Sequence, residues 1–254
     1  MQRSIAPQGV RGDCSFYKPA VFGFALALLA AVSGVMAPVG SRVGVWNYAF
    51  ASQILGWTAF AGAVAVLLCL AGVVKTRPPG RRRGFVLSLV GLLVLVPVIV
   101  LPAYWGYAKT KFPPIQDIST DTRHPPEFWF APNARMYGGP KTAALQRKAY
   151  PDIGPLVLSL PAEQAFDLAL AVVRDKGWEV WVANPEEGRI EATEVTFWFG
   201  FSDDVSIRVT ELDGGSRIDV RSASRFGSGG DGGANANRVR SFVSALKRRA
   251  GVEP

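Results

Sequence analysis

Charged and apolar side chains alternate along two neighbouring segments, 204–209 and 217–225, which hold the residues best suited to bind a ligand. A period of two predicts β-strands that have one polar and one apolar face. The sequence Asp213-Gly214-Gly215 between the two segments is typical of a hairpin turn. Because the apolar faces must pack on helices, we expect the polar face to be the open face of a sheet. The residues on this face are Asp204, Ser206, Arg208, Arg217, Asp219, Arg221, Ala223 and Arg225.

Three arginines on the polar face, Arg208, Arg221 and Arg225, allow two interpretations. They could form a ladder of exposed salt bridges, in which each pair would stabilise the sheet by about 0.2–1 kcal/mol. They could instead bind an anionic ligand or a partner protein, because a guanidinium pairs with a carboxylate or a phosphate through two parallel hydrogen bonds. We hypothesise that at least one of the three arginines binds an anionic group.

A second group of candidate binding residues surrounds the start of the last predicted helix, at about 236–250. Asp231, Asn235 and Arg238 lie there, and Asn235 is the expected N-cap. The string 227–232 fits G-x-G-x-x-G, but no parallel strand follows it, so we interpret it as a flexible loop and not as a dinucleotide site. Backbone N–H groups at the helix start could still bind an anionic group.

Residue types that perform catalysis or bind metals are scarce in this sequence. His124 is the only histidine, and Cys14 and Cys69 both lie in the apolar half, so we expect no metal site, disulfide or cofactor in the polar half. Asp203 and Asp204 are adjacent, so on a strand they would point to opposite faces and could not form a carboxylate dyad. They could cap a turn or bind a cation weakly. We therefore expect no enzyme and no catalytic residue, with a carboxylate-dependent hydrolase as the alternative.

The net charge of +8 is placed entirely in the first half of the chain. Residues 1–108 hold nine Lys or Arg residues and one acidic residue, whereas residues 109–254 hold 19 basic and 19 acidic residues. A protein that binds nucleic acid needs its basic excess on the folded domain, where it can face phosphates. The neutral second half therefore argues against a nucleic-acid partner.

Three windows near the N-terminus contain no charged residue and exceed the roughly 20 apolar residues that a helix needs to cross a membrane. Aromatic residues open the second window and close the third, as expected at membrane interfaces. We expect membrane-spanning helices near 20–38, 50–74 and 85–107. The lipid bilayer is thus a predicted partner of this chain.

The distribution of basic residues predicts the orientation of these helices. The loop at 75–83 holds five Lys or Arg residues, whereas the preceding loop holds only Arg42. The positive-inside rule places the basic loop, and with it the N-terminus flanked by Arg3 and Arg11, in the cytoplasm. The part of the chain that follows the third helix then lies outside the cytoplasm. A cleaved signal peptide that ends near Ala37 is the alternative for the first helix, and it would leave the last domain on the same side.

The remaining chain divides into a linker and a domain. Residues 109–155 hold eight of the 18 prolines, which argues against a helix or a central strand, and their many aromatic residues predict packing on the domain. Residues 156–254 show the element order β-α-β-β-β-β-α. We expect an α+β domain whose antiparallel sheet carries two helices on one face.

Four ordered motifs in this half resemble a known family. They are Asp117-Ile-Ser-Thr-Asp121-Thr-Arg-His-Pro125-Pro126-Glu-Phe128, Gly200-Phe201-Ser-Asp203-Asp204-Val-Ser-Ile-Arg208-Val, Asp219-Val-Arg221-Ser-Ala-Ser-Arg225 and Asp231-Gly-Gly-Ala-Asn235-Ala-Asn-Arg238-Val-Arg240. The chain resembles the family catalogued as domain of unknown function 1499 over about residues 112–250. The resemblance implies a bacterial envelope protein, often membrane-anchored, and implies no known activity.

We therefore expect a three-span protein of the inner or plasma membrane that displays a periplasmic domain. The domain would bind or scaffold, with an anionic envelope ligand or an envelope protein as its partner. Besides the hydrolase, an accessory subunit of a transporter is an alternative. The three windows carry no Asp, Glu, Lys or Arg, however, and ion pathways usually need such residues.

Overall fold

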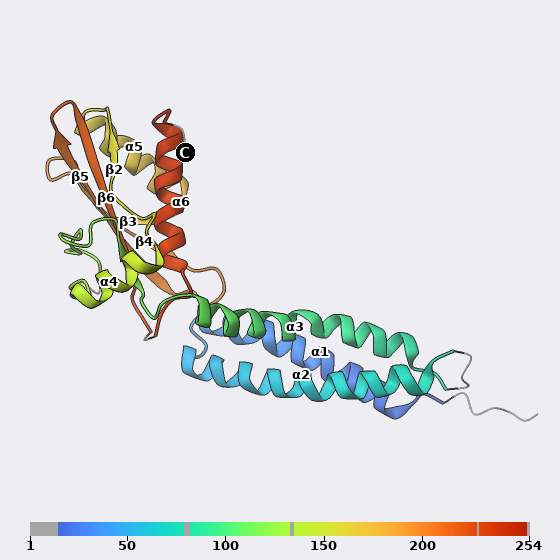
Figure 1. Ribbon diagram of the computed structural model, residues 1–254. Helices are drawn as coiled ribbons and strands as arrows, with labels where there is room; N and C mark the ends of the chain where they lie inside the picture. The colour runs from blue at the N-terminus through green and yellow to red at the C-terminus, as the bar shows by residue number, and fades with distance from the viewer. Residues whose placement is uncertain (1–14, 79–81, 133–134, 228, 253–254) are drawn as a thin grey trace, which may run out of the picture. The chain divides into compact units, whose positions relative to one another are not determined.

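The computed structural model describes residues 15–78, 82–132, 135–227 and 229–252, and the chain forms two compact units, residues 1–104 and 105–254. Three residues named above, Arg3, Arg11 and Cys14, lie outside the described residues, as do Arg81 of the basic loop at 75–83 and Ser228 of the glycine-rich string. Figure 1 shows the elements of both units in chain order. Each unit is described by itself.

The first unit consists of long apolar helices, as the sequence predicts. They are α1 (Lys18–Arg42), α2 (Tyr48–Thr76) and α3 (Phe85–Lys111), whose last residues enter the second unit. Each helix is long and apolar enough to cross a membrane, α3 over Phe85–Ala108. All three helices begin before or end after the expected bounds, and α1 continues through Pro38 to Arg42.

Small residues let these helices approach closely, as is common in membranes. A Cβ atom added at Gly23 of α1 would lie 2.9 Å from the Leu68 Cβ of α2. One added at Gly72 of α2 would lie 2.1 Å from the Ser88 Oγ of α3 and 3.0 Å from the Ala20 Cβ of α1. The glycines are therefore required by the distance between the helices.

The second unit is built on a six-stranded, wholly antiparallel sheet of order β1-β6-β5-β4-β3, in which β2 also pairs with β6. Its strands are β1 (Asp117–Ser119), β2 (Leu156–Leu158), β3 (Glu179–Asn184), β4 (Arg189–Val195), β5 (Ser202–Leu212) and β6 (Gly215–Ser224). The expected hairpin is present, with Gly214 in the left-handed region at φ 79°. The strands β1 and β2 lie one after the other along the same edge of β6.

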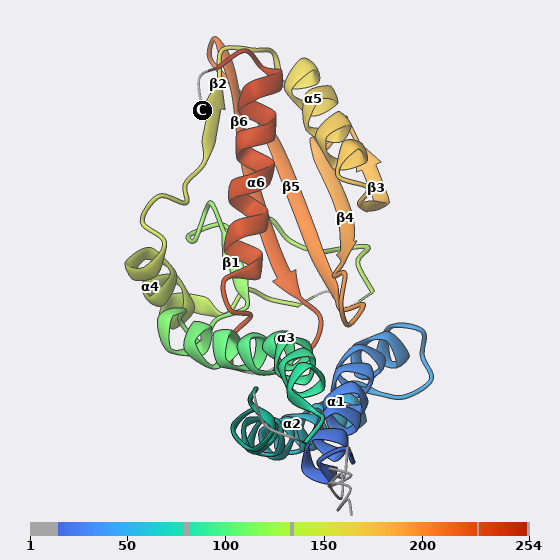
Figure 2. The same ribbon diagram turned by 90° about the vertical axis from the view of Figure 1, so that its right-hand side faces the viewer.

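Two helices, α5 (Ala162–Asp175) and α6 (Ala234–Arg249), cover one face of this sheet (Figure 2). The apolar side chains of the alternating segments, such as Ile207 and Val220, are buried against them. Phe166 of α5 and Phe242 of α6 complete this core. The predicted α+β class, with two helices on one face of an antiparallel sheet, is confirmed.

The expectation that the proline-rich segment 109–155 contains no helix is wrong. Helix α4 (Gly139–Ala149) lies within it, and Pro140 stands in its first turn. Proline is tolerated there because the first backbone N–H groups of a helix have no partner in the helix. The segment also supplies β1, which is short and stands at the edge of the sheet, where prolines that flank a strand do not interrupt the ladder.

Candidate functional site

The polar face of the hairpin is not open, and the expectation of a solvated charged face is wrong. The segments 120–132 and 135–137, which we together call the strap, run across the face of the sheet opposite α5 and α6 (green in Figure 1). Asp204, Asp219 and Arg221 are buried beneath it. Strand periodicity correctly separates the two faces, but it does not show that a distant segment covers one of them.

Arg221 is the most enclosed of the three candidate arginines, with 1% of its surface exposed. Its Nε and Nη2 atoms donate to the two carboxylate oxygens of Asp117 at 2.9 and 2.8 Å. It also donates to the backbone oxygens of Pro126 and Arg135 in the strap, and its Cζ lies 4.6 Å from the centre of the Phe128 ring. All of these partners belong to the same chain, so the anion that Arg221 binds is Asp117.

Arg225 has a similar arrangement at the end of β6. It donates to both carboxylate oxygens of Asp204 at 2.7–3.0 Å and to the Thr193 hydroxyl at 2.8 Å. That hydroxyl in turn donates to Asp204 and accepts from the indole N–H of Trp181. Trp181 also lies beneath the guanidinium, at 5.9 Å from its Cζ to the ring centre. The anion that Arg225 binds is therefore Asp204.

Arg208 belongs to a cluster of two arginines and two aspartates at the middle of the hairpin. Arg208 and Arg217 both donate to Asp219, and both also reach Asp121 of the strap at 3.3 and 2.9 Å. This cluster is the part of the face that most resembles the predicted salt-bridge ladder. Burial raises the pKa of Asp121, but the backbone N–H groups of His124 and Arg123 and the charges of Arg217 and Arg208 outweigh it and lower the pKa.

Glu191 of β4 is a buried carboxylate that the sequence reasoning missed. It accepts hydrogen bonds from three successive backbone N–H groups of the strap, those of Trp129, Phe130 and Ala131, at 2.9–3.0 Å. The alternation of Arg189, Glu191 and Thr193 with apolar residues was the available signal, because it places Glu191 on the same polar face. Glu191 thus fixes the position of the strap over the sheet.

The remaining candidate residues lie on the opposite face, where Asn235 and Arg238 of α6 and the preceding Asp231 are found beside Asp203 of β5. Asp203 and Asp204 point to opposite faces, as expected of neighbours in a strand, and Asp203 accepts from Arg238 Nη2 at 2.6 Å. Arg238 also pairs with Glu194 and donates to the Asn235 side chain. The structure therefore divides the predicted site residues between the two faces of the sheet.

Asn235 is not the N-cap of the last helix, so that expectation is wrong. The helix begins at Ala234, and its cap residue is Gly233 in the left-handed region at φ 87°. The carboxylate of Asp231 accepts from the backbone N–H groups of Gly233 and Asn235 at 2.8 and 2.7 Å. Asn235 is buried, and its side chain bonds to Ser222, Ser224 and the backbone of Gln116. The anionic group at this helix start is thus Asp231 itself.

A hollow of about 360 Å³ remains on the surface of the second unit, between the strap and the strands β4 and β5. Arg189 lines it, and its Cζ lies 3.8 Å from the centre of the Trp129 ring. Its Nη2 atom pairs with Glu187 at 3.3 Å, whereas its buried Nη1 atom has no hydrogen-bond partner among the described residues. Arg208 and Arg123 also line the hollow. The hollow is therefore lined by an arginine that keeps one buried donor atom without a partner among the described residues.

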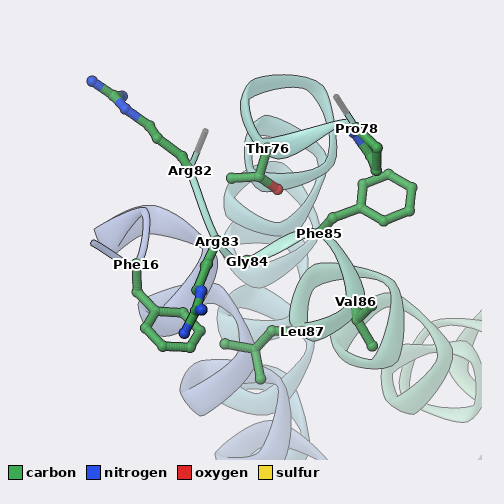
Figure 3. A pocket seen from close by; sticks show the side chains of 9 residues that line it. All are labelled: Phe16, Thr76, Pro78, Arg82, Arg83, Gly84, Phe85, Val86 and Leu87. Atoms are coloured by element: carbon green, nitrogen blue, oxygen red, sulfur yellow. The ribbon is translucent and has the colours of Figure 1, made fainter. Parts of the chain in front are cut away.

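A second hollow, of about 330 Å³, lies in the first unit at the loop between α2 and α3 (Figure 3). Its walls are mostly apolar, including Phe16, Phe85 and Leu87, and Arg82 extends away from the other lining side chains. The backbone oxygen of Arg83 accepts from the Tyr17 N–H at 2.9 Å. Cations beside apolar walls are typical of the boundary between membrane and water.

These features define a protein with three helices long and apolar enough to span a membrane, followed by an antiparallel α+β domain with a buried ionic core beneath a strap. The family model described as "Protein of unknown function (DUF1499)" matches residues 117–246, and the chain belongs to this family. The match begins at β1 and includes the strap, so both are part of the family domain. No curated protein matches the chain.

Proposed function

We propose that this chain is an integral membrane protein whose C-terminal domain, held outside the cytoplasm, binds an anionic group of an envelope ligand or partner protein. The proposed site is the hollow beside Arg189. The observation that supports it is the buried Arg189 Nη1 atom, which has no hydrogen-bond partner among the residues described. Leaving such a donor unsatisfied costs about 1–3 kcal/mol, and a carboxylate or phosphate oxygen would remove that cost.

The charges around the hollow favour an anion. Three arginines and two glutamates, Glu127 and Glu187, line it, so its lining carries a net charge of +1. Glu127 accepts from the Trp129 indole N–H at 3.0 Å, and Glu187 pairs with Arg189. The contact with the Trp129 ring, 3.8 Å from the Arg189 Cζ to the ring centre, restricts the movement of the guanidinium. The hypothesis therefore keeps Arg208 from the original set and replaces Arg221 and Arg225 with Arg189.

Binding is tested with the full chain in lipid nanodiscs and with inorganic phosphate and succinate as probes. We expect at least one probe to raise the melting temperature of the wild-type protein and to leave the melting temperature of the Arg189→Gln variant unchanged. Arg240→Gln is the matched control, because Arg240 is paired with Asp152 on the surface and does not line the hollow. Equal shifts in the wild type and Arg189→Gln, or no shift with either probe, would reject the site.

The proposed orientation has its own test. It rests on the five basic residues at 75–83, which the positive-inside rule places in the cytoplasm. A reporter enzyme that is active only outside the cytoplasm should be active when fused after Pro254 and inactive when fused within 75–83. The opposite pattern would reverse the orientation without affecting the hollow.

A further inference from the structure

Exposed aromatic side chains gather at one end of the sheet of the second unit. Phe197 and Trp198 in the turn between β4 and β5 expose 77% and 52% of their surface, and Phe226, just after β6, exposes 68%. Phe197 and Trp198 pack edge to face with 5.4 Å between their ring centres. Exposed apolar groups that cluster in this way mark a surface that contacts another partner.

The turn that carries these side chains is an ordered structure. The Thr196 N–H donates to the Phe201 oxygen at 2.8 Å, and the Phe201 N–H donates to the Thr196 hydroxyl at 2.9 Å. Gly200 adopts φ 68°, in the left-handed region, and lies in the turn that follows the end of β4 at Val195. The aromatic side chains are therefore presented by a defined backbone.

The register of the sheet places this turn at the same end of the sheet as the start of β1, where the chain arrives from α3. Asp117, the first residue of β1, pairs with Ala223, which pairs with Asp204, which pairs with Thr193. The turn begins just after Val195, so it extends beyond the level of Asp117 by two residues of β4, about 7 Å, before the chain reverses. Phe226 follows Ala223 at the same end of the sheet.

The connection between α3 and the sheet is short. The apolar span ends at Ala108, helix α3 ends at Lys111, and β1 begins at Asp117. Three helical residues and six extended steps reach at most about 25 Å. The headgroup layer on one side of a bilayer is itself about 5–8 Å thick. With α3 in the bilayer, Asp117 therefore lies within about 25 Å of the end of the apolar span, and the turn projects from the sheet at the end that holds Asp117.

The composition of this end of the sheet fits a lipid surface. The segments 112–116, 195–202 and 226–230 of the sequence contain no charged residue. Tryptophan and tyrosine are enriched at the interface between membrane and water, and Tyr104, Trp105 and Tyr107 at the end of α3 show the same preference. A surface for a soluble protein partner would instead have a polar or charged rim.

We propose that the turn 196–201 and Phe226 contact the headgroup region of the bilayer that holds the three helices, and so fix the domain against the membrane. The contact requires neither the anion site nor a particular orientation of the chain, because only the chain connection and the sheet register place it. Arg208, which lines the hollow described above, lies six residues along β5 from Ser202, about 20 Å from this end of the sheet. The hollow therefore remains available to a ligand.

The test uses the full chain with Cys14→Ser and Cys69→Ala, reconstituted in phosphatidylcholine nanodiscs. A single cysteine is introduced as Trp198→Cys or Phe226→Cys and labelled with a fluorophore that is sensitive to polarity. Asp213→Cys is the matched control, because it lies in the turn between β5 and β6 at the opposite end of the same hairpin. Lipids that carry a nitroxide near the headgroup quench a label only where it touches the membrane.

We expect loss of emission for the labels at 198 and 226 and no loss for the label at 213. The labels at 198 and 226 are introduced in separate variants, so if one substitution disturbs the fold the other remains informative. Hydrogen exchange of the β6 amides shows whether each variant is folded. Emission at both positions that is unchanged by the nitroxide lipid, as at 213, would overturn the proposal. Shielding of both labels from aqueous iodide without lipid quenching would also overturn it, and would assign the surface to a protein or to a second copy of the chain.

Discussion

The buried pair Arg221–Asp117 should be among the most sensitive points of the domain. Arg221→Met removes four hydrogen bonds and leaves the Asp117 carboxylate without its cation beneath the strap. Removing one partner of a buried ion pair costs about 3–5 kcal/mol, which is a large part of the about 5–15 kcal/mol that stabilises a typical domain. An exposed pair costs about 1 kcal/mol or less. The two interpretations of this arginine therefore differ by several-fold in free energy.

Hydrogen exchange of the β6 amides, measured by mass spectrometry on the full chain in nanodiscs, reports this free energy. Because about 1.4 kcal/mol is a factor of ten, protection in Arg221→Met should fall by roughly two to three and a half orders of magnitude. Arg240→Met is the matched control, since Arg240 makes a similar two-bond pair with Asp152 but both side chains are well exposed, at 37% and 55%. It should change protection by less than about one order of magnitude.

A double variant separates the ion pair from the space that it fills. Asp117→Leu combined with Arg221→Met replaces both charges with apolar side chains, and such replacements of buried pairs are often close to neutral. We expect the double variant to be more protected than Arg221→Met alone. The reasoning would be refuted if Arg221→Met cost no more than Arg240→Met, or if adding Asp117→Leu lowered protection further.

Two more predictions concern the membrane helices and the strap. Gly72→Leu should lower the free energy of unfolding of the purified chain by about 1–3 kcal/mol, because a Cβ atom at Gly72 would lie 2.1 Å from the Ser88 Oγ. Gly56→Leu is the control and should be tolerated, because a Cβ atom there has no neighbour within 4 Å. Equal losses of stability in the two variants would contradict this packing. Asp121→Asn should destabilise the domain at pH 7 and much less at acid pH. Because the folded pKa of Asp121 is lowered, its stabilisation is present above the ordinary carboxyl pKa of about 4 and is lost as the pH falls through the folded value. Unfolding curves at both pH values check this, and a difference that does not depend on pH would contradict it.

The sequence alone was sufficient to predict the three long apolar helices and the two faces of the hairpin. Apolar windows of this length need no tertiary information, because lipid accepts an apolar helix on every side. The alternation along 204–209 and 217–225 likewise separated Asp203 from Asp204 and directed Ile207 to the core. Both patterns depend on local geometry alone, since a helix or strand fixes the direction of each side chain relative to its neighbours.

Only the tertiary structure decided what the polar face of the hairpin contacts. Arg221 binds Asp117 from 104 residues away, and Glu191 binds the N–H groups of Trp129 to Ala131 from about 60 residues away. Nothing in the spacing of either partner identifies the other. Period-two alternation indicates that a side chain points away from the apolar core. Whether that side chain contacts water or a buried carboxylate depends on the path of a distant segment. The proline-rich strap follows such a path, and it converts a face that looks solvent-exposed in the sequence into a second, ionic core.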